Sequence, residues 1–248
     1  MNKKYLLISC IIILYYLFYK YSTNLEFFTV ISKNPGPTLF LIGGTHGNEP
    51  AGAVGLNHII NEIKNGKIKI KYGKIIILSR ANKSGLFFNS RFMLHNLFNR
   101  DLNRNYPINK NEKPRDYISK KITNIVDQAD WIIDFHEGWG YARVNKESMG
   151  SGIYPGKFEE SIDIANLLMT NINKQISNPK KKFIVSTGVH PNLNALKNYA
   201  ALQNKKYILI ETTGQNNVQP LKVRKNQVIN IVYNFLNITK QCEIKKYN

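Results

Sequence analysis

The sequence predicts an α/β domain with a largely parallel central β-sheet and helices on both of its faces. Two observations predict this class. Short apolar runs, rich in β-forming residues and bounded by turn residues, indicate strands, and helix-like segments of ten to twenty residues lie between these runs. Strands that alternate with helices in this way usually form a sheet buried between two helical layers.

Four of these runs are expected to be buried strands, and a fifth run is weaker. The four runs are residues 38–42, 75–79, 131–135 and 207–210, and the fifth is 183–186. The helices expected between them cover residues 50–63, 114–126, 158–176, 193–202 and 218–236. In such sheets the ligand site lies beyond the carboxyl ends of the strands, so the residues that follow each strand are the candidates for chemistry.

The first 21 residues are expected to form a membrane anchor. Residues 5–19 (YLLISCIIILYYLFY) carry no charge and would span about 22 Å as a helix, against about 30 Å for the hydrocarbon core. The tyrosines at the end of this run and Lys20 suit the membrane interface. A single-pass anchor that meets the membrane through residues 5–19 is therefore expected. A cleaved signal segment of a secreted protein and a buried core helix are the alternatives.

The composition fits one domain with a substantial core, because 43% of the 248 residues are hydrophobic. The formal net charge of +19 favours an anionic partner. However, Lys, Asn and Ile are enriched along the whole chain, and no stretch combines clustered Arg with aromatic residues, so no nucleic-acid partner is expected. The two cysteines, Cys10 and Cys242, lie at opposite ends and provide neither a disulfide framework nor a cysteine zinc site.

Histidines and glutamates that are candidates for a metal site and its general base follow three of the expected strands. GGTHGNEPAG follows residues 38–42, HEG follows 131–135, and ETTG follows 207–210. Two histidines and one glutamate with an open fourth position form a known catalytic zinc set, and His46, Glu49 and His136 can supply it. Glu211 is then the general base that takes a proton from a water molecule activated by the single zinc ion.

The other histidines and one neighbouring glutamate are given structural roles. His58, His95 and His190 are expected on the surface or in loops. Glu137 follows His136 directly, so its side chain is expected to point to the opposite face of the strand.

A long segment without clear periodicity, residues 80–107, is a second candidate region, because such segments in compact domains are usually functional or mobile. It contains RANKSG, then Arg91, then NRDLNRNYP. An Asn-Arg pair can hold a carboxylate, and a further arginine can stabilise an oxyanion. A solvated basic loop is the alternative for this segment alone.

Together these motifs resemble the zinc carboxypeptidase superfamily, and within it the succinylglutamate desuccinylase and aspartoacylase branch. The string GGTHGNE is similar to the deacylase branch, and DLNRNYP is similar to the superfamily motif that binds the substrate carboxylate. Asn82-x-x-Gly85 followed by Arg91 resembles the loop with the oxyanion arginine. WIIDFHEG resembles the strand with the third zinc ligand, and ILIETTG resembles the strand that ends in the catalytic glutamate.

The resemblance, which runs from about residue 38 to residue 214, implies a mixed sheet between helices and a role for each candidate residue. It implies one zinc ion per chain, held by His46, Glu49 and His136. The catalytic residues it implies are Glu211, as base and then proton donor, and Arg91, which polarises the scissile carbonyl and for which Arg100 is the alternative. The substrate-binding residues it implies are Asn103, Arg104 and Tyr199, the last as the counterpart of the family's mobile tyrosine, with Tyr154 as the second choice.

The sequence therefore predicts a zinc-dependent hydrolase that cleaves an amide bond next to a free carboxylate. Its substrate is expected to be a small carboxylate-bearing molecule or a peptide C-terminus. Residues 43–49 favour an N-acyl-amino-acid deacylase, whereas the 37 residues after Glu211, too few for the extra β domain of aspartoacylases, favour a metallocarboxypeptidase. The alternatives are an inactive member of the fold that acts as a binding protein and a basic protein that binds anionic surfaces. The expected organisation is an anchor or signal segment (1–21), a linker (22–37), a catalytic domain (38–240) and a C-terminal tail (241–248).

Overall fold

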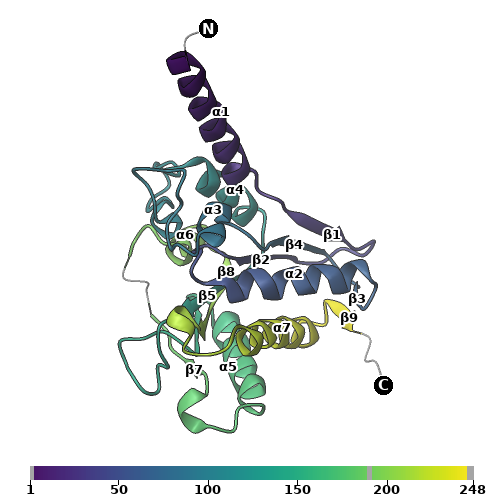
Figure 1. Cartoon of the computed structure of the whole chain (residues 1–248). Coiled ribbons are helices and arrows are strands. Elements are labelled where there is room, and N and C mark those ends of the chain that lie inside the picture. The colour runs from purple at the N-terminus through teal and green to yellow at the C-terminus, as the bar shows by residue number, and fades with distance from the viewer. Residues whose placement is uncertain (1–2, 189–191, 245–248) are drawn as a thin grey trace.

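The central sheet is mixed and largely parallel, as the sequence predicts (Figure 1). This computed structural model describes residues 3–188 and 192–244. Within them seven strands form one sheet in the order β1-β4-β2-β5-β8-β6-β7. Its parallel centre consists of β4 (Lys74–Leu78), β2 (Thr38–Gly43), β5 (Trp131–Gly138) and β8 (Lys206–Thr213). At the edges, β1 (Phe28–Ile31) and β6 (Gly152–Pro155) pair antiparallel with β4 and β8, and β7 (Ile184–Val185) pairs parallel with β6.

Helices cover both faces of the sheet, because the side chains of each central strand alternate between two apolar cores. Leu39 and Leu41 of β2 belong to the core under α2 (Pro50–Lys64), α5 (Glu159–Asn173) and α7 (Leu221–Ile238). Phe40 and Ile42 belong to the opposite core, under α4 (Tyr117–Val126) and α6 (Leu196–Leu202). Each fully buried side chain of this size contributes about 1.5–3 kcal/mol to folding, so the strands are fixed from both sides.

All five predicted helices are present, with ends shifted by up to three residues. Three of them begin three residues later than predicted, at Tyr117, Leu196 and Leu221. The residue before each of these helices has extended rather than helical backbone. Before α4, the side chain of Asp116 accepts hydrogen bonds from the amides of the first turn, which fixes that start.

The remaining elements are short, and the sequence does not predict them. They are α3 (Lys83–Phe87), three 3-10 turns, η1 (Leu102–Arg104), η2 (Pro179–Lys181) and η3 (Gln215–Asn217), and a small antiparallel sheet of β3 (Ile68–Ile70) with β9 (Cys242–Ile244). Strand β1 lies in the expected linker and β9 in the expected C-terminal tail, so both segments contribute to sheets. The weak fifth run forms only the two-residue edge strand β7.

Helix α1 (Lys3–Thr23) projects from the domain (Figure 1). Among the described residues, the stretch Tyr5–Thr23 is the one helix long and apolar enough to cross a membrane. Only 11% of that window is buried, which contradicts the alternative of a core helix. A membrane anchor and a signal segment share this length and composition, so both interpretations of residues 1–21 stand.

Candidate metal centre and active site

The loop between β2 and α2 places His46 and Glu49 side by side. Gly44 has a positive φ of 67°, which glycine adopts without strain. A Cβ atom on Gly47 would lie 1.8 Å from the backbone of Gly85, so only glycine fits there. The amide of Glu49 donates to the carbonyl of His46 (3.2 Å), which closes a turn just before α2 begins. The two side chains therefore meet, with His46 Nδ1 2.9 Å from Glu49 Oε1.

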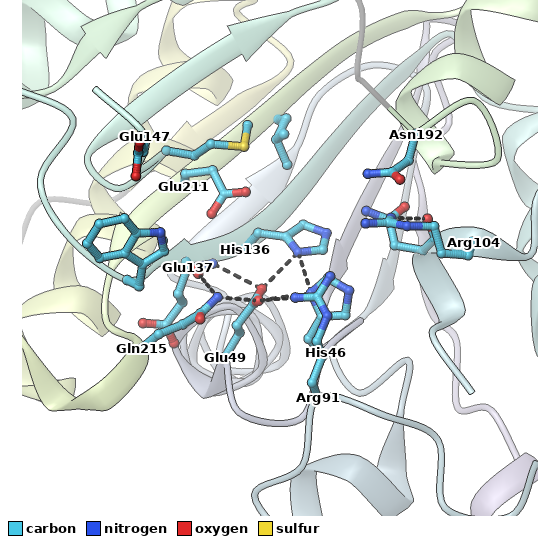
Figure 2. A pocket seen from close by; sticks show the side chains of 15 residues that line it. His46, Glu49, Arg91, Arg104, His136, Glu137, Glu147, Asn192, Glu211 and Gln215 are labelled. Carbon is cyan, nitrogen blue, oxygen red and sulfur yellow. Dashed lines mark hydrogen bonds and ion pairs between the residues drawn. The ribbon is translucent and has the colours of Figure 1, made fainter. Parts of the chain in front are cut away.

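His136 and Glu211 lie on adjacent parallel strands and face each other in register. Both strands extend three residues beyond the predicted runs, so these residues are strand residues and do not follow the strands. Neighbouring residues in register point to the same face of a sheet and lie about 5 Å apart. Figure 2 shows both side chains directed into one cavity, opposite His46 and Glu49.

The donor atoms of His46, Glu49 and His136 converge on one point. His136 Nδ1 lies 2.8 Å from Glu49 Oε2 and 3.1 Å from His46 Nδ1. Two nitrogens at about 2.0–2.1 Å from a tetrahedral zinc ion are about 3.3 Å apart, close to this separation. The three residues are buried, and their ligand atoms all lie within 4.8 Å of one another. The donor set, two imidazoles and one carboxylate, suits zinc and leaves a further position for water or substrate.

Carboxylates behind the two imidazoles orient them. His46 Nε2 bonds Asp101 Oδ1 (3.1 Å), and His136 Nε2 lies 3.3 Å from Asp134 Oδ1. In metal sites such outer carboxylates fix the tautomer and ring orientation of histidine ligands and raise their basicity. Glu49 is held in a similar way, since its carboxylate accepts from the side-chain amide of Gln215 (2.9 Å) and from the backbone amide of Glu137 (3.1 Å).

The burial and charge of the site move the pKa values of its groups apart. Burial raises the pKa of Glu49, but His46 and His136 outweigh it and hold that pKa well below its usual range. Burial lowers the pKa of His136, but the carboxylates of Asp134 and Glu49 outweigh it and raise that pKa well above its usual value. Burial raises the pKa of Glu211 to about 8, although His136 beside it lowers it. Carboxylates thus surround the two imidazoles, which favours a cation at this point.

Three residues of segment 80–107, Arg91, Asn103 and Arg104, line the same cavity, whose volume is about 230 Å³. Asn103 and Arg104 belong to η1, and both line the cavity. The side chain of Asn103 accepts from the amide of Leu196 (2.9 Å), which fixes the turn against α6. Figure 2 shows the Arg104 side chain across the cavity from Glu211.

Arg91 lies at the cavity and Arg100 does not. Arg91 contacts Glu49 Oε1 at 3.4 Å and Asp101 Oδ2 at 3.1 Å, whereas the Arg100 guanidinium lies 4.9 Å from the ring of Phe92. Of the two arginines that the sequence left as candidates for polarising the carbonyl, the structure brings Arg91 to the candidate metal ligands.

The structure does not bring Tyr199 to the cavity, contrary to the sequence prediction. Its side chain is buried in α6, where the hydroxyl donates to Asp127 Oδ1 (2.8 Å) and the ring stacks on Tyr106 with centroids 6.3 Å apart. Tyr154 is closer to the site, since its hydroxyl donates to the carbonyl of Met149 (3.0 Å), a residue that lines the cavity.

Glu137 points away from the metal ligands, as expected for the neighbour of His136 in a strand. Its carboxylate forms a buried ion pair with Arg224 of α7 and accepts from the amide of Ala51 (2.7 Å) at the start of α2. This buried pair ties α7 to the helix end that carries Glu49. Helix N-termini favour negative charge, so the carboxylate stabilises this end of α2.

Two of the remaining histidines, His58 and His95, lie apart from the cavity. His58 is on α2 beside Glu62, and His95 lies in a loop with its ring 5.8 Å from that of Tyr19. His95 is nevertheless buried, because α1 covers it. His190 lies outside the described residues.

The sequence analysis missed several residues around the site. They are Asp101, Asp134 and Gln215, which hold the ligands, and Trp139, Glu147, Met149 and Asn192, which line the cavity. Asp101 and Asp134 lie inside two of the motifs already singled out, DLNRNYP and WIIDFHEG. A carboxylate two residues before a strand histidine, on the same face, is the signal that identifies Asp134.

Comparison with known proteins confirms the resemblance predicted from the motifs. Residues 35–146 match the family model of the succinylglutamate desuccinylase/aspartoacylase catalytic domain. No curated protein sequence matches the chain.

Solved structures confirm the carboxypeptidase-like fold. Tripeptide-bound cell shape determinant Csd4 from Helicobacter pylori is 19% identical with a TM-score of 0.74, over 90% of this chain and 57% of Csd4. Csd4, which has also been solved in an mDAP-bound form, is described as a D,L-carboxypeptidase. A succinylglutamate desuccinylase from Silicibacter (13% identity, TM-score 0.64) and an aspartoacylase family protein from Mesorhizobium loti (17%, 0.61) each match over 90% of this chain and 63% of theirs. The chain thus spans less than two thirds of the length of these three proteins.

Proposed function

We propose that this chain, which carries the desuccinylase/aspartoacylase signature in residues 35–146, is a zinc-dependent hydrolase that cleaves an amide bond next to a free carboxylate. The observation that carries the proposal is the convergence of His46, Glu49 and His136 beside Glu211, with two arginines across the same cavity. Residues 38–240 are the proposed catalytic domain, with one zinc ion held by the three ligands.

Each side chain has a defined task in this reaction. When bound, zinc would supply a Lewis acid that lowers the pKa of water and polarises the scissile carbonyl. Glu211 takes the proton of the attacking water and passes it to the leaving amine. A cation at the ligands would also lower the raised pKa of Glu211, which leaves its carboxylate ready to accept that proton.

Arg104 and Arg91 act on different groups of the substrate. Arg104, with the backbone of its turn fixed by Asn103, provides a guanidinium for the free carboxylate of the substrate. Arg91 lies beside the ligand Glu49, where it can stabilise negative charge that develops on the carbonyl oxygen.

Two substrate classes fit this chemistry, and each has an observation in its favour. The likeness to Csd4, solved with a bound tripeptide, favours the C-terminal residue of a peptide. The family model over residues 35–146 favours an N-acyl amino acid. Parallel assays of the full chain on peptides with free and amidated C-termini and on N-acyl amino acids separate the two classes. Turnover of peptides alone would exclude the deacylase.

Two variants and their matched controls test the mechanism. His136→Ala should lose the metal, as measured by elemental analysis, while His58→Ala on α2 retains it. Glu211→Gln should retain the metal and lose about 10²–10⁴-fold in kcat, while Glu159→Gln, exposed on α5, retains activity. If the wild-type chain takes up no zinc, or if Glu211→Gln leaves kcat unchanged, the proposal is wrong. A chain that binds zinc but turns over neither substrate class would be the inactive binding protein.

A further inference from the structure

Helix α1 touches the rest of the protein only near its C-terminal end. Its earlier residues are exposed, for example Leu14 at 65%, whereas Ser22 and Thr23 are buried. The contacts are aromatic: the ring of Phe18 lies 6.2 Å from that of Phe88, and the ring of Tyr19 lies 5.8 Å from that of His95. The base of α1 is therefore fixed on segment 87–98, the loop that follows α3 (Figure 1).

That segment exposes large apolar side chains. The exposed fractions are 71% for Phe87, 55% for Phe88, 75% for Leu97 and 93% for Phe98. A side chain of this size gains about 1.5–3 kcal/mol when it is fully removed from water. Exposure of several large apolar side chains close to one end of a second apolar element indicates an interaction surface.

The length of α1 identifies the occupant of this surface. The uncharged residues 5–19 span about 22 Å, most of the roughly 30 Å of the hydrocarbon core. A bilayer that encloses this stretch therefore reaches down to the point where Phe18 and Tyr19 contact the segment. Strand β1 begins only five residues after α1 ends, so no stalk separates the domain from the bilayer.

The chemistry around this level matches a lipid interface. Tyr15, Tyr16 and Tyr19 lie on the last turns of α1, and tyrosine is enriched where hydrocarbon meets headgroups. Lys20 follows them, and Arg100 is exposed with its guanidinium over the ring of Phe92. Both cations suit anionic headgroups.

We propose that segment 87–98 and the last turns of α1 together form a lipid-facing surface that seats the domain directly on the bilayer. The occupant is the headgroup region of an anionic membrane, which the apolar side chains of the segment enter. This role is independent of the hydrolase activity, and its test requires no substrate.

The test uses the full chain, with Cys10→Ser and Cys242→Ala, reconstituted in phosphatidylcholine vesicles with and without phosphatidylglycerol. A nitroxide attached through Phe98→Cys reports its collisions with oxygen and with a water-soluble nickel chelate. The matched control is Leu167→Cys, which is 49% exposed on α5, far from α1 (Figure 1). A second probe, Leu97→Cys, covers a variant that fails to fold.

The expected result is at least fivefold lower collision with nickel at position 98 or 97 than at position 167, with higher collision with oxygen. Equal nickel accessibility at position 98 (or 97) and at position 167 would overturn the proposal, and so would a folded chain that does not insert into the vesicles. If the low collision with nickel at position 98 or 97 disappears when the protein-to-lipid ratio is lowered tenfold, the surface contacts a second copy of the chain. That result would also overturn the proposal.

Discussion

Asp101 holds the metal centre and the arginine wall together, so its removal should weaken both. One carboxylate oxygen bonds His46 Nε2 (3.1 Å), and the other accepts from Arg91 at 3.1 and 3.2 Å. Asp101→Ala removes both interactions and frees the imidazole to rotate. Loss of such an outer carboxylate typically lowers metal affinity by 10–100-fold, which corresponds to about 1.4–2.7 kcal/mol.

The substitution Asp101→Asn separates the two contributions. The amide keeps an acceptor for His46 but loses the negative charge that pairs with Arg91. Its effect on zinc affinity should therefore lie between those of the wild type and the alanine variant. Because Arg91 is one-third exposed, the charge term itself is expected to be small, within about 1 kcal/mol.

The assay is competition for zinc between the full-length protein and a chromogenic chelator at constant pH. Asp163→Asn, an exposed aspartate on α5, is the matched control and should bind zinc like the wild type. Wild-type zinc affinity in Asp101→Ala would refute the role of this carboxylate. A larger loss in the asparagine variant than in the alanine variant would refute the division into two contributions.

Three further substitutions test separate parts of the structure. Tyr199→Phe should lower the free energy of unfolding by about 1 kcal/mol in urea and leave KM unchanged, because its hydroxyl bonds Asp127, which does not line the cavity; a raised KM would return it to the substrate site. Gly47→Ala should lose zinc affinity, because its Cβ would overlap the backbone of Gly85, whereas Gly140→Ala, whose nearest contact would be 3.6 Å, should not. Burial lowers the pKa of Lys197 to about 8, so between pH 8 and about 10 the unfolded chain holds a proton that the folded chain has lost, and the free energy of unfolding should rise with pH. Lys197→Met should therefore raise the free energy of unfolding by roughly 2 kcal/mol at pH 7. A difference between variant and wild type that does not change with pH would contradict this.

The convergence of His46, Glu49 and His136 could be predicted because their positions depend on elements with strong sequence signals. Apolar runs identify the central strands, and parallel strands end at one edge of the sheet, so His46, Glu49 and His136 had to converge there. Glu211 follows from the same argument, since its strand lies beside β5 in register. In each case the local pattern identifies the strand, and the pairing of the parallel strands brings the residues together.

The residues that support the trio have weaker signals in the sequence than the trio itself. Asp134 lies inside an apolar run, where its strand signal hides the polar side chain, and Asp101 reaches His46 only because a long loop folds back over the site. Tyr199 was misplaced for a related reason. Nothing in its sequence context shows that α6 directs its ring onto Tyr106 instead of the cavity. The edge strands β1 and β6 are short and form through pairing with β4 and β8, which short sequences do not reveal.

The two halves of the site are built on different supports, and this has a consequence for how variants should behave. The candidate ligands and Glu211 belong to the sheet or its immediate ends, whereas Arg91 and Arg104 belong to a loop that is fixed to His46 through Asp101 and to α6 through Asn103. Substitution of Arg104 should therefore change KM for carboxylate-bearing substrates without changing zinc affinity. Substitution of Asp101 should change both together, because its carboxylate is the contact shared by a metal ligand and the arginine wall.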